Sequence, residues 1–247
     1  MERITLDQVS KQFMINSKNN SALDSTIGFF SRKTKTRFWV LKNISFSAGA
    51  GENTGIIGKN GSGKSTLLRV IAGIYAVDSG KIETNGKIVY LNGLAPGLKK
   101  KLTVRENIYL IGSLLGLSQK DIQNKFNAII EFSGVQEFVD TKVFKLSSGM
   151  VARFAFSATI HFVEHRNPDI ILLDEVFGAG ADADFQKKAI HRMEELINSG
   201  ATVLLASHNL DLIKTYCHRA IWIDKGEISK LGEAKDVCEA YAAFTTV

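Results

Sequence analysis

The stretch Gly58-Lys59-Asn60-Gly61-Ser62-Gly63-Lys64-Ser65-Thr66 decides the fold, because it follows the pattern G-x-x-x-x-G-K-[S/T]. A short apolar strand, Thr54-Gly55-Ile56-Ile57, precedes it, and apolar residues at helical spacing follow it from Leu67 to Ala72. In such a strand–loop–helix unit, glycines let backbone N–H groups form a nest for anions, and the helix adds its positive N-terminal end. The sequence therefore predicts a phosphate-binding loop (P-loop) in an α/β fold.

The polar side chains of this loop have expected partners in a nucleoside triphosphate. Lys64 would reach the β- and γ-phosphates, and the Ser65 hydroxyl would ligate Mg²⁺. The residues expected to contact ATP here are Gly58, Asn60, Gly61, Ser62, Gly63, Lys64, Ser65 and Thr66. The alternative is a glycine-rich turn that binds nothing, and the strand and helix around the loop argue against it.

Two carboxylates follow a second predicted strand. The apolar run Ile170-Ile171-Leu172-Leu173 is typical of a buried parallel strand and ends in Asp174 and Glu175. Ligands bind at the carboxyl ends of such strands, so we expect Asp174 to hold Mg²⁺ and Glu175 to orient or deprotonate the attacking water. Beside a P-loop, this pair indicates the second half of a nucleotide site.

Strands and helices alternate along the rest of the chain. A third apolar run, Thr202-Val203-Leu204-Leu205, is separated from the second by a helical pattern over 185–198. His208 follows this run, where it is placed either to contact a γ-phosphate or to be an ordinary surface or core histidine. Residues 103–165 are mostly helical in pattern and are expected to form a subdomain inserted into an α/β domain.

Composition bounds the class of protein. The chain has 247 residues, with 31 Lys and Arg against 25 Asp and Glu, a formal net charge of +6 that suits phosphate ligands, nucleic acid or an anionic membrane surface. Its two cysteines, Cys217 and Cys238, have no metal-binding spacing and favour a reducing compartment. The first residues lack the apolar core of a signal peptide, and no apolar run is long enough to cross a membrane.

A further segment, Leu146-Ser147-Ser148-Gly149-Met150 with Arg153 after it, resembles the signature Leu-Ser-Gly-Gly-Gln of the ATP-binding-cassette (ABC) ATPases. The P-loop, the signature, the two carboxylates and the histidine stand in the order typical of that family, so the resemblance covers nearly the whole chain. It implies an α/β, RecA-like P-loop ATPase core with an N-terminal antiparallel β subdomain and an inserted α-helical subdomain. The expected division of the single domain 1–247 is a nucleotide-binding core at about 1–102 and 166–247, an insert loop at 15–38 and a helical, signature-bearing subdomain at 103–165.

The resemblance also implies cofactors and roles for single residues. ATP and Mg²⁺ are the implied cofactors, Phe13 matches the aromatic residue that stacks on adenine, and Phe38 and Trp39 are the other candidates. Such domains work as head-to-tail pairs that close on two ATP molecules. The signature contacts to the ATP of the second subunit are matched by Ser147, Ser148 and Gly149. The aspartate at the dimer seam is matched by Asp182, and the catalytic groups are matched by Lys64, Glu175 and His208.

Three departures from the family pattern indicate which subfamily the chain resembles. Met150 replaces the usual glutamine of the signature, and Val176 replaces the proline that commonly follows Asp-Glu. The family also has a glutamine that contacts Mg²⁺ and takes part in coupling to the membrane subunit. The corresponding segment of this chain, 92–97, contains no glutamine, which leaves Asn92 as the candidate metal contact. These features resemble the ATPases that export cell-surface polysaccharide, namely O-antigen, capsule and teichoic acid.

The subfamily implies specific partners and a location. We expect a separate transmembrane permease subunit, a second copy of this chain, and lipid-linked polysaccharide as an indirect partner, with no nucleic acid. The expected location is the cytoplasmic face of the inner (plasma) membrane, as a peripheral subunit. Lys99-Lys100-Lys101 lies where this family docks the permease, and the last predicted helix, 234–243, ends so near Val247 that we expect no C-terminal carbohydrate-binding domain.

Several alternatives stay open at this stage. The chain can be the ATPase of another ABC transporter, such as an importer. A mechanical ATPase on nucleic acid would need long heptad arms or two fused cassettes, and a small-molecule kinase leaves the signature segment unexplained. The stretch 31–43, with five basic residues and no acid, fits either a surface near anionic headgroups or a solvated loop.

Overall fold

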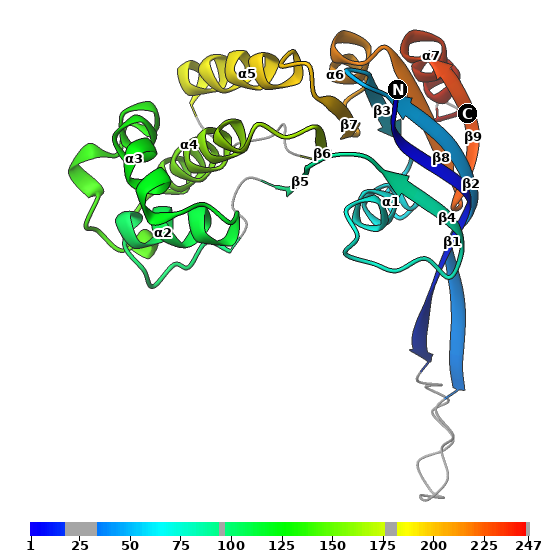
Figure 1. The fold of residues 1–247 in the computed structure, drawn as a ribbon, viewed down its shortest axis with the longest axis horizontal. Coiled ribbons are helices and arrows are strands. Elements are labelled where there is room, and N and C mark those ends of the chain that lie inside the picture. The colour runs from blue at the N-terminus through cyan, green and yellow to red at the C-terminus, as the bar shows by residue number, and fades with distance from the viewer. Residues whose placement is uncertain (18–33, 94–96, 176–181, 246–247) are drawn as a thin grey trace, which may run out of the picture.

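Two β-sheets and a group of helices form the part of the chain that the computed structural model describes, residues 1–17, 34–93, 97–175 and 182–245 (Figure 1). The larger sheet has the strand order β5-β6-β7-β3-β8-β9. Its strands are β3 (Asn53–Ile57), β5 (Ile88–Asn92), β6 (Ile170–Asp174), β7 (Thr202–Ala206), β8 (Arg219–Asp224) and β9 (Glu227–Glu233). All neighbours from β5 to β8 are parallel, and β9 pairs with β8 in the antiparallel sense. β3, β6 and β7 are buried along their whole length, as strands covered on both faces must be.

Helix α1 (Lys64–Ile71) lies between this sheet and a smaller antiparallel sheet of order β2-β1-β4. The strands of the smaller sheet are β1 (Glu2–Ser17), β2 (Thr34–Gly49) and β4 (Ser79–Thr84). One buried cluster joins the three layers, since it contains Leu67 of α1, Leu41 of β2 and Leu172 of β6. This packing fixes the start of α1, and therefore the P-loop, between the two sheets.

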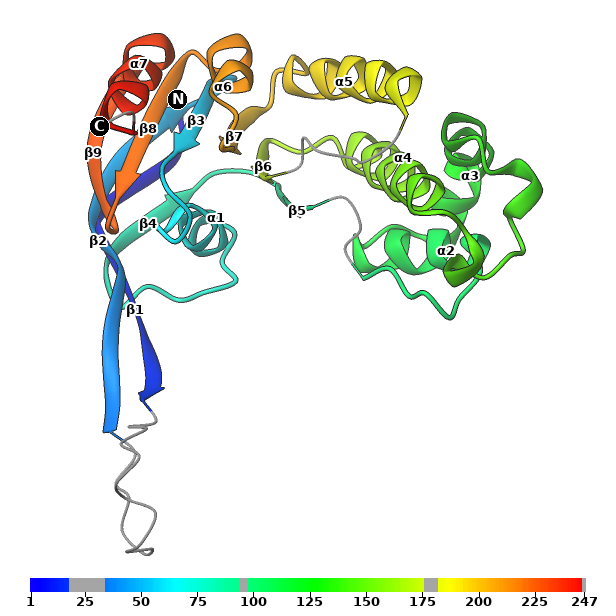
Figure 2. The ribbon, with the colours of Figure 1, turned by 180° about the vertical axis from the view of Figure 1, so that it is seen from behind.

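Three helices, α5 (Ala183–Ile197), α6 (Leu210–Tyr216) and α7 (Ala234–Thr245), lie on the other face of the larger sheet (Figures 1 and 2). A second buried cluster holds them there, with Met193 of α5, Ile213 of α6 and Val237 of α7 against Val203 of β7. The parallel sheet is therefore covered on both sides, which is the arrangement that lets ligands bind at the carboxyl ends of its strands.

The remaining helices pack around a core of their own, away from α1 (Figure 1). They are α2 (Val104–Leu114), α3 (Gln119–Ser133), the short 3₁₀ turns η2 (Gln136–Phe138) and η3 (Val143–Lys145), and α4 (Ser148–Arg166). Thr103 and Glu106 form a capping box at the start of α2, and Phe154 and Phe162 of α4 are fully buried in this core. Among the described helices, none is long and apolar enough to cross a membrane.

The predicted α/β class with an antiparallel sheet and inserted helices is confirmed, and both ends of the segment expected to be an insert loop, 15–38, are strand residues in the structure. Residues 15–17 and 34–38 are strand residues, because Ser17 pairs with Thr34, Ile15 with Thr36 and Phe13 with Phe38. β-branched and aromatic residues favour such extended pairing, which the polar and basic composition of 15–38 masked in the sequence. The rest of the predicted insert, residues 18–33, lies outside the described residues.

Candidate nucleotide-binding site

The P-loop connects the buried strand β3 to α1, and its glycines are required by its backbone. Gly58 and Gly63 have φ values of 148° and 115°, which favour glycine. A Cβ atom on Gly58 would collide with the backbone of Ile223 in β8, and one on Gly63 would lie 2.9 Å from the Val40 carbonyl oxygen. The loop is thus held close to two strands by residues without side chains.

Lys64 is the buried cation of this loop. Its side chain is only 7% exposed, and its ammonium donates to the carbonyl oxygens of Gly58 at 2.7 Å and Lys59 at 3.3 Å. Burial lowers the pKa of Lys64, and the nearby carboxylates of Glu175 and Asp174 act against that shift. The hydroxyl of Ser62 is also buried and has no hydrogen-bond partner among the described residues. A buried ammonium bound to neutral carbonyls and an unpaired buried hydroxyl are the groups that a polyphosphate would satisfy.

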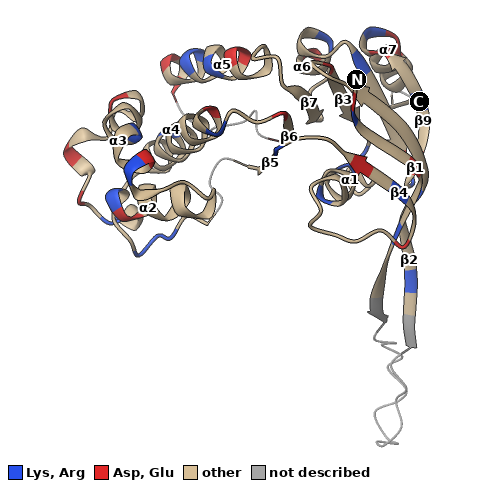
Figure 3. Cartoon of the chain, in the orientation of Figure 1, with Lys and Arg blue, Asp and Glu red and all other residues tan. Residues whose placement is uncertain are grey.

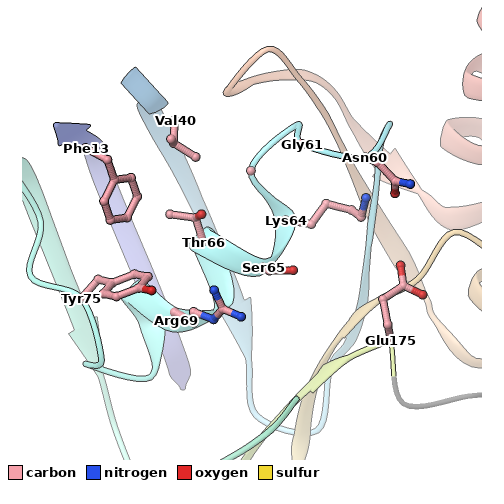
Figure 4. Close-up of a pocket in the computed structure, with 11 residues that line it drawn as sticks. Phe13, Val40, Asn60, Gly61, Lys64, Ser65, Thr66, Arg69, Tyr75 and Glu175 are labelled. Atoms are coloured by element: carbon pink, nitrogen blue, oxygen red, sulfur yellow. The ribbon is translucent and has the colours of Figure 1, made fainter. Parts of the chain in front are cut away.

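An open pocket of about 460 Å³ extends from the P-loop (Figure 4). Phe13 and Tyr75 line one end, with their ring centroids 5.3 Å apart in an edge-to-face arrangement, and Glu175 lines the other end. Phe38 and Trp39, the alternative stacking candidates, are 53% and 42% exposed and do not belong to its lining. The sequence analysis did not predict three of the lining residues, Val40, Arg69 and Tyr75. The full lining is Phe13, Val40, Asn60, Gly61, Gly63, Lys64, Ser65, Thr66, Arg69, Tyr75 and Glu175.

Asp174 lies at the carboxyl end of β6, where the sequence predicted a metal ligand. Asp174 is buried, with 2% exposure. Its Oδ1 atom accepts a 2.9 Å hydrogen bond from the Ser65 hydroxyl, and its Oδ2 atom accepts a 2.9 Å hydrogen bond from the Tyr90 hydroxyl. Burial, followed by the bond to Asp174, raises the pKa of Tyr90 to about 12. A carboxylate beside a hydroxyl is an oxygen donor set that fits Mg²⁺, which accepts few protein ligands together with substrate phosphates.

The candidate metal contact Asn92 remains a prediction. It is the last residue of β5, in register with Asp174 of β6, but it is exposed and is not part of the pocket lining. The following residues 94–96, where the sequence departs from the family pattern, lie outside the described residues, as does Val176. Tyr90, two residues before Asn92 on the same strand, contacts Asp174 instead.

Glu175 and His208 meet at the ends of two neighbouring strands. The Nδ1 atom of His208 lies 2.7 Å from Oε2 of Glu175. Glu175 follows β6 in a left-handed backbone conformation, with φ 53°, and its N–H donates to the carbonyl oxygen of Ala206 at the end of β7. This conformation turns the Glu175 side chain into the pocket, and backbone strain at a non-glycine residue is a feature of functional sites.

The signature residues do not meet the P-loop of their own chain. Ser147 caps α4 by accepting from the backbone N–H of Met150 at 3.2 Å, and Ser147 and Ser148 are exposed. Asp182 caps α5 by accepting from the N–H of Phe185 at 2.9 Å and lies 3.5 Å from Nη1 of Arg153 on α4. Ser147, Ser148, Gly149 and Asp182 are not part of the pocket lining.

Residues 41–178, which include the P-loop, the signature segment and both carboxylates, match the ABC transporter family. The chain belongs to the ABC transporter family. It is 39% identical to "Teichoic acids export ATP-binding protein TagH" of Lactococcus lactis subsp. lactis (strain IL1403) over 246 residues, 98% of this chain and 51% of the relative. It is 38% identical to "O-antigen export system ATP-binding protein RfbB" of Klebsiella pneumoniae over 205 residues, 83% of this chain and 81% of the relative. The chain spans about half the length of the TagH relative.

Solved structures of ABC cassettes share its fold. A dimeric, post-hydrolysis structure of the ATP-binding cassette MJ0796 bound to ADP and Pi superposes with a TM-score of 0.69, at 21% identity, over 94% of this chain and 98% of that one. A nucleotide-free ATP-binding cassette from an ABC transporter gives a TM-score of 0.66 at 25% identity, over 98% and 96% of the two chains. The predicted ABC ATPase fold is therefore confirmed.

Proposed function

We propose that this chain is the ATP-hydrolysing subunit of an ABC exporter for lipid-linked cell-surface polysaccharide of the O-antigen, capsule or teichoic-acid type. The observation that carries the ATPase part is the pocket lined by P-loop residues, by Ser65 and by Glu175. Ser65 is hydrogen-bonded to Asp174, and Glu175 lies within hydrogen-bond distance of His208. The polysaccharide part is supported by the curated relatives, whose names describe teichoic-acid and O-antigen export. A separate transmembrane subunit would be energised by the hydrolysis.

Seven side chains in or next to the pocket have a chemical task in this proposal. Phe13 and Tyr75 hold the adenine ring through apolar and aromatic contact, and Lys64 with the P-loop N–H groups holds the phosphates. Ser65 and Asp174 would hold Mg²⁺, which when bound neutralises charge on the phosphate oxygens. Glu175 accepts the proton of the attacking water, and His208 orients the Glu175 carboxylate through its contact with Oε2.

A second copy of the chain completes the site in this proposal. The signature residues Ser147 and Ser148 are exposed at the start of α4, outside the pocket of their own chain. An exposed helix N-terminus is an anion-binding element, so it fits the γ-phosphate of ATP on another subunit. A head-to-tail pair places each signature over the partner's P-loop, and Asp182 then lies at the seam.

The permease would dock on the helical part of the chain. Lys99, Lys100 and Lys101 are exposed just before α2, and the fully buried Asn107 fixes their backbone through hydrogen bonds to and from Lys99. Phe144, 59% exposed, donates its N–H to the carbonyl of Lys100. An apolar and cationic surface of this kind suits a protein partner at the cytoplasmic face of the membrane. On α5, basic residues lie between acidic residues at both ends of the helix (Figure 3), so this helix is not a uniformly basic surface of the kind that favours a nucleic-acid partner.

The test is reconstitution with the membrane partner. The chain is purified from its source cells with the transmembrane protein that accompanies it, and phosphate release is measured with and without the co-purified lipid-linked glycan. We expect the glycan to stimulate hydrolysis, and Lys64→Ala to abolish it while weakening ATP binding by about 2–4 kcal/mol. Near-normal hydrolysis by Lys64→Ala would contradict the ATPase assignment, whereas stimulation only by a periplasmic binding protein would indicate an importer.

A further inference from the structure

A closed circuit of side chains joins α1 to the middle of β5 and the end of β6. Ser65 and Arg69 are four residues apart on α1 and therefore share one helix face. Ser65 donates to Oδ1 of Asp174 at 2.9 Å, Tyr90 donates to Oδ2 at 2.9 Å, and Nε of Arg69 donates to the Tyr90 hydroxyl oxygen at 3.2 Å. Both oxygens of the candidate metal carboxylate are thus fixed from different elements.

The Arg69 bond decides the direction of the Tyr90 hydroxyl. A guanidinium can only donate, so the hydroxyl oxygen is the acceptor in that pair and its single proton remains available for another bond. The Asp174 carboxylate is the acceptor within 2.9 Å. Arg69 therefore orients Tyr90 as a donor, and the proton of Tyr90 is directed at Oδ2 of Asp174.

The ring and the hydroxyl of Tyr90 make separate contacts. Its ring packs against the cluster between α1 and the larger sheet, a contact that phenylalanine would preserve. Its backbone is in register with Leu172, two residues before Asp174 on the adjacent parallel strand. The hydroxyl therefore reaches Asp174 diagonally across the strand pair, whereas Asn92 lies directly beside Asp174 and is exposed.

From this circuit we infer that Tyr90 is a positioning residue for the metal carboxylate Asp174, held in place by Arg69. By occupying Oδ2, Tyr90 keeps the plane of the carboxylate fixed and Oδ1 toward Ser65, which is the arrangement that the candidate Mg²⁺ site needs. Hydrogen-bonding partners of metal-bound carboxylates commonly tune metal affinity in this way. The inference rests on the ATP- and Mg²⁺-binding part of the proposed function and concerns no step of polysaccharide transport.

The test compares Tyr90→Phe with the wild-type chain in two binding measurements. Calorimetric titration gives the affinity for ATP in excess EDTA, and a Mn²⁺ titration of the ATP-bound chain, followed by electron paramagnetic resonance, gives the affinity for the metal. We expect Tyr90→Phe to weaken metal binding about 10-fold and to leave the metal-free ATP affinity unchanged. The half-saturating Mg²⁺ concentration for hydrolysis should rise by the same factor.

Tyr216→Phe is the matched control. The Tyr216 hydroxyl donates to the Glu194 carboxylate at 2.7 Å, between α6 and α5 and away from the pocket. Its removal deletes the same kind of bond, so metal affinity should stay at the wild-type value.

The outcomes separate this inference from the proposed function. Equal metal affinity in Tyr90→Phe and wild type, or an equal loss in Tyr216→Phe, would overturn the positioning role while leaving the ATPase assignment intact. A Tyr90→Phe chain that loses metal-free ATP binding would show a structural role, which also overturns the inference. Absence of metal-dependent ATP binding in the wild-type chain would overturn the proposed function itself.

Discussion

The Nδ1 atom of His208 lies 2.7 Å from Oε2 of Glu175, and this contact joins the segments that follow β7 and β6, at the end of the pocket that Glu175 lines. The two side chains are 78% and 39% exposed, so solvent screens their attraction and the contact can break and reform. Among the described residues, no hydrogen bond reaches the other carboxylate oxygen, Oε1, which is an acceptor for water in the proposed function. In the proposed function, Glu175 acts on this water and His208 orients Glu175.

Glu175→Gln should bind ATP but hydrolyse it about 10²–10⁴-fold more slowly. The glutamine has nearly the same volume and can still hydrogen-bond to water, but it cannot accept the proton. If hydrolysis ends the closed state, the ATP-bound dimer should accumulate by mass action. Phosphate release and size-exclusion chromatography with light scattering, each with and without Mg-ATP, measure the two effects.

Asp174→Asn is the companion variant of Glu175→Gln. It changes the carboxylate that accepts from Ser65 and Tyr90, so it should impair Mg²⁺-dependent ATP binding as well as turnover. Retained turnover in Glu175→Gln would move the role of activating water to another group, with His208 the first to test. Loss of ATP binding in Glu175→Gln would instead show a structural role for that residue.

Phe13→Ala should weaken ATP binding by about 0.5–1.5 kcal/mol, and Phe13→Tyr should bind almost normally. Phe13 lines the pocket and packs on Tyr75, so in the proposed function it offers adenine an aromatic face and not a polar atom. Trp39→Ala is the control, because Trp39 does not belong to the pocket lining. Calorimetric titration with ATP measures all three, and a loss confined to Trp39→Ala would reassign the stacking residue.

The positions of the catalytic candidates could be predicted because strand ends carry them. Parallel strands place their carboxyl ends at one edge, so the residues after β3, β6 and β7 had to meet, and Ser65 with Asp174 and Glu175 with His208 do. The position of Arg69 could be predicted from helical spacing, because it lies one helical turn after Ser65 on α1. The sequence analysis did not use that spacing.

Tyr75, Val40 and Tyr90 could not be placed in the same way. The contact of Tyr75 with Phe13 and that of Val40 with the P-loop depend on how β1, β2 and α1 pack, which no local pattern specifies. The bond of Tyr90 to Asp174 depends on the register of β5 with β6. In each case the missing information is long-range packing, not chemistry.

The buried histidine His161 predicts a loss of stability at acid pH. Burial lowers its pKa below the ordinary value of 6.5, and the nearby cations Arg192 and Lys125 add to this, against its bond to the Ser157 carbonyl. As pH falls below 6.5, the unfolded chain takes up the proton first, so folding stability falls by at most about 1.4 kcal/mol per pH unit. Urea unfolding at a series of pH values between 7.5 and 5 measures this slope.

His161→Gln is the control for the pH series. It removes the titrating group, so the variant should lose less stability than the wild type over the same range, whatever its stability at neutral pH. The comparison is needed because burial raises the pKa of the nearby Glu164, which acts in the opposite direction as pH falls. Equal slopes in the variant and the wild type would show that His161 does not titrate differently on unfolding.

Ser147→Arg should block hydrolysis in a homodimer while leaving ATP binding by the single chain nearly intact. The exposed cap of α4 lies outside its own pocket, so an added cationic side chain there obstructs only the nucleotide of the partner. Lys64→Ala damages the opposite half of the composite site. A mixed dimer of the two variants then contains one doubly damaged site and one intact site, and random pairing should restore roughly a quarter of the wild-type activity. Phosphate release from the mixture measures this recovery, and single-turnover hydrolysis of one bound ATP detects the intact site even when repeated cycling needs both. A mixture as inactive as either parent in both measurements, with ATP-dependent dimerisation preserved, contradicts a signature that acts in trans.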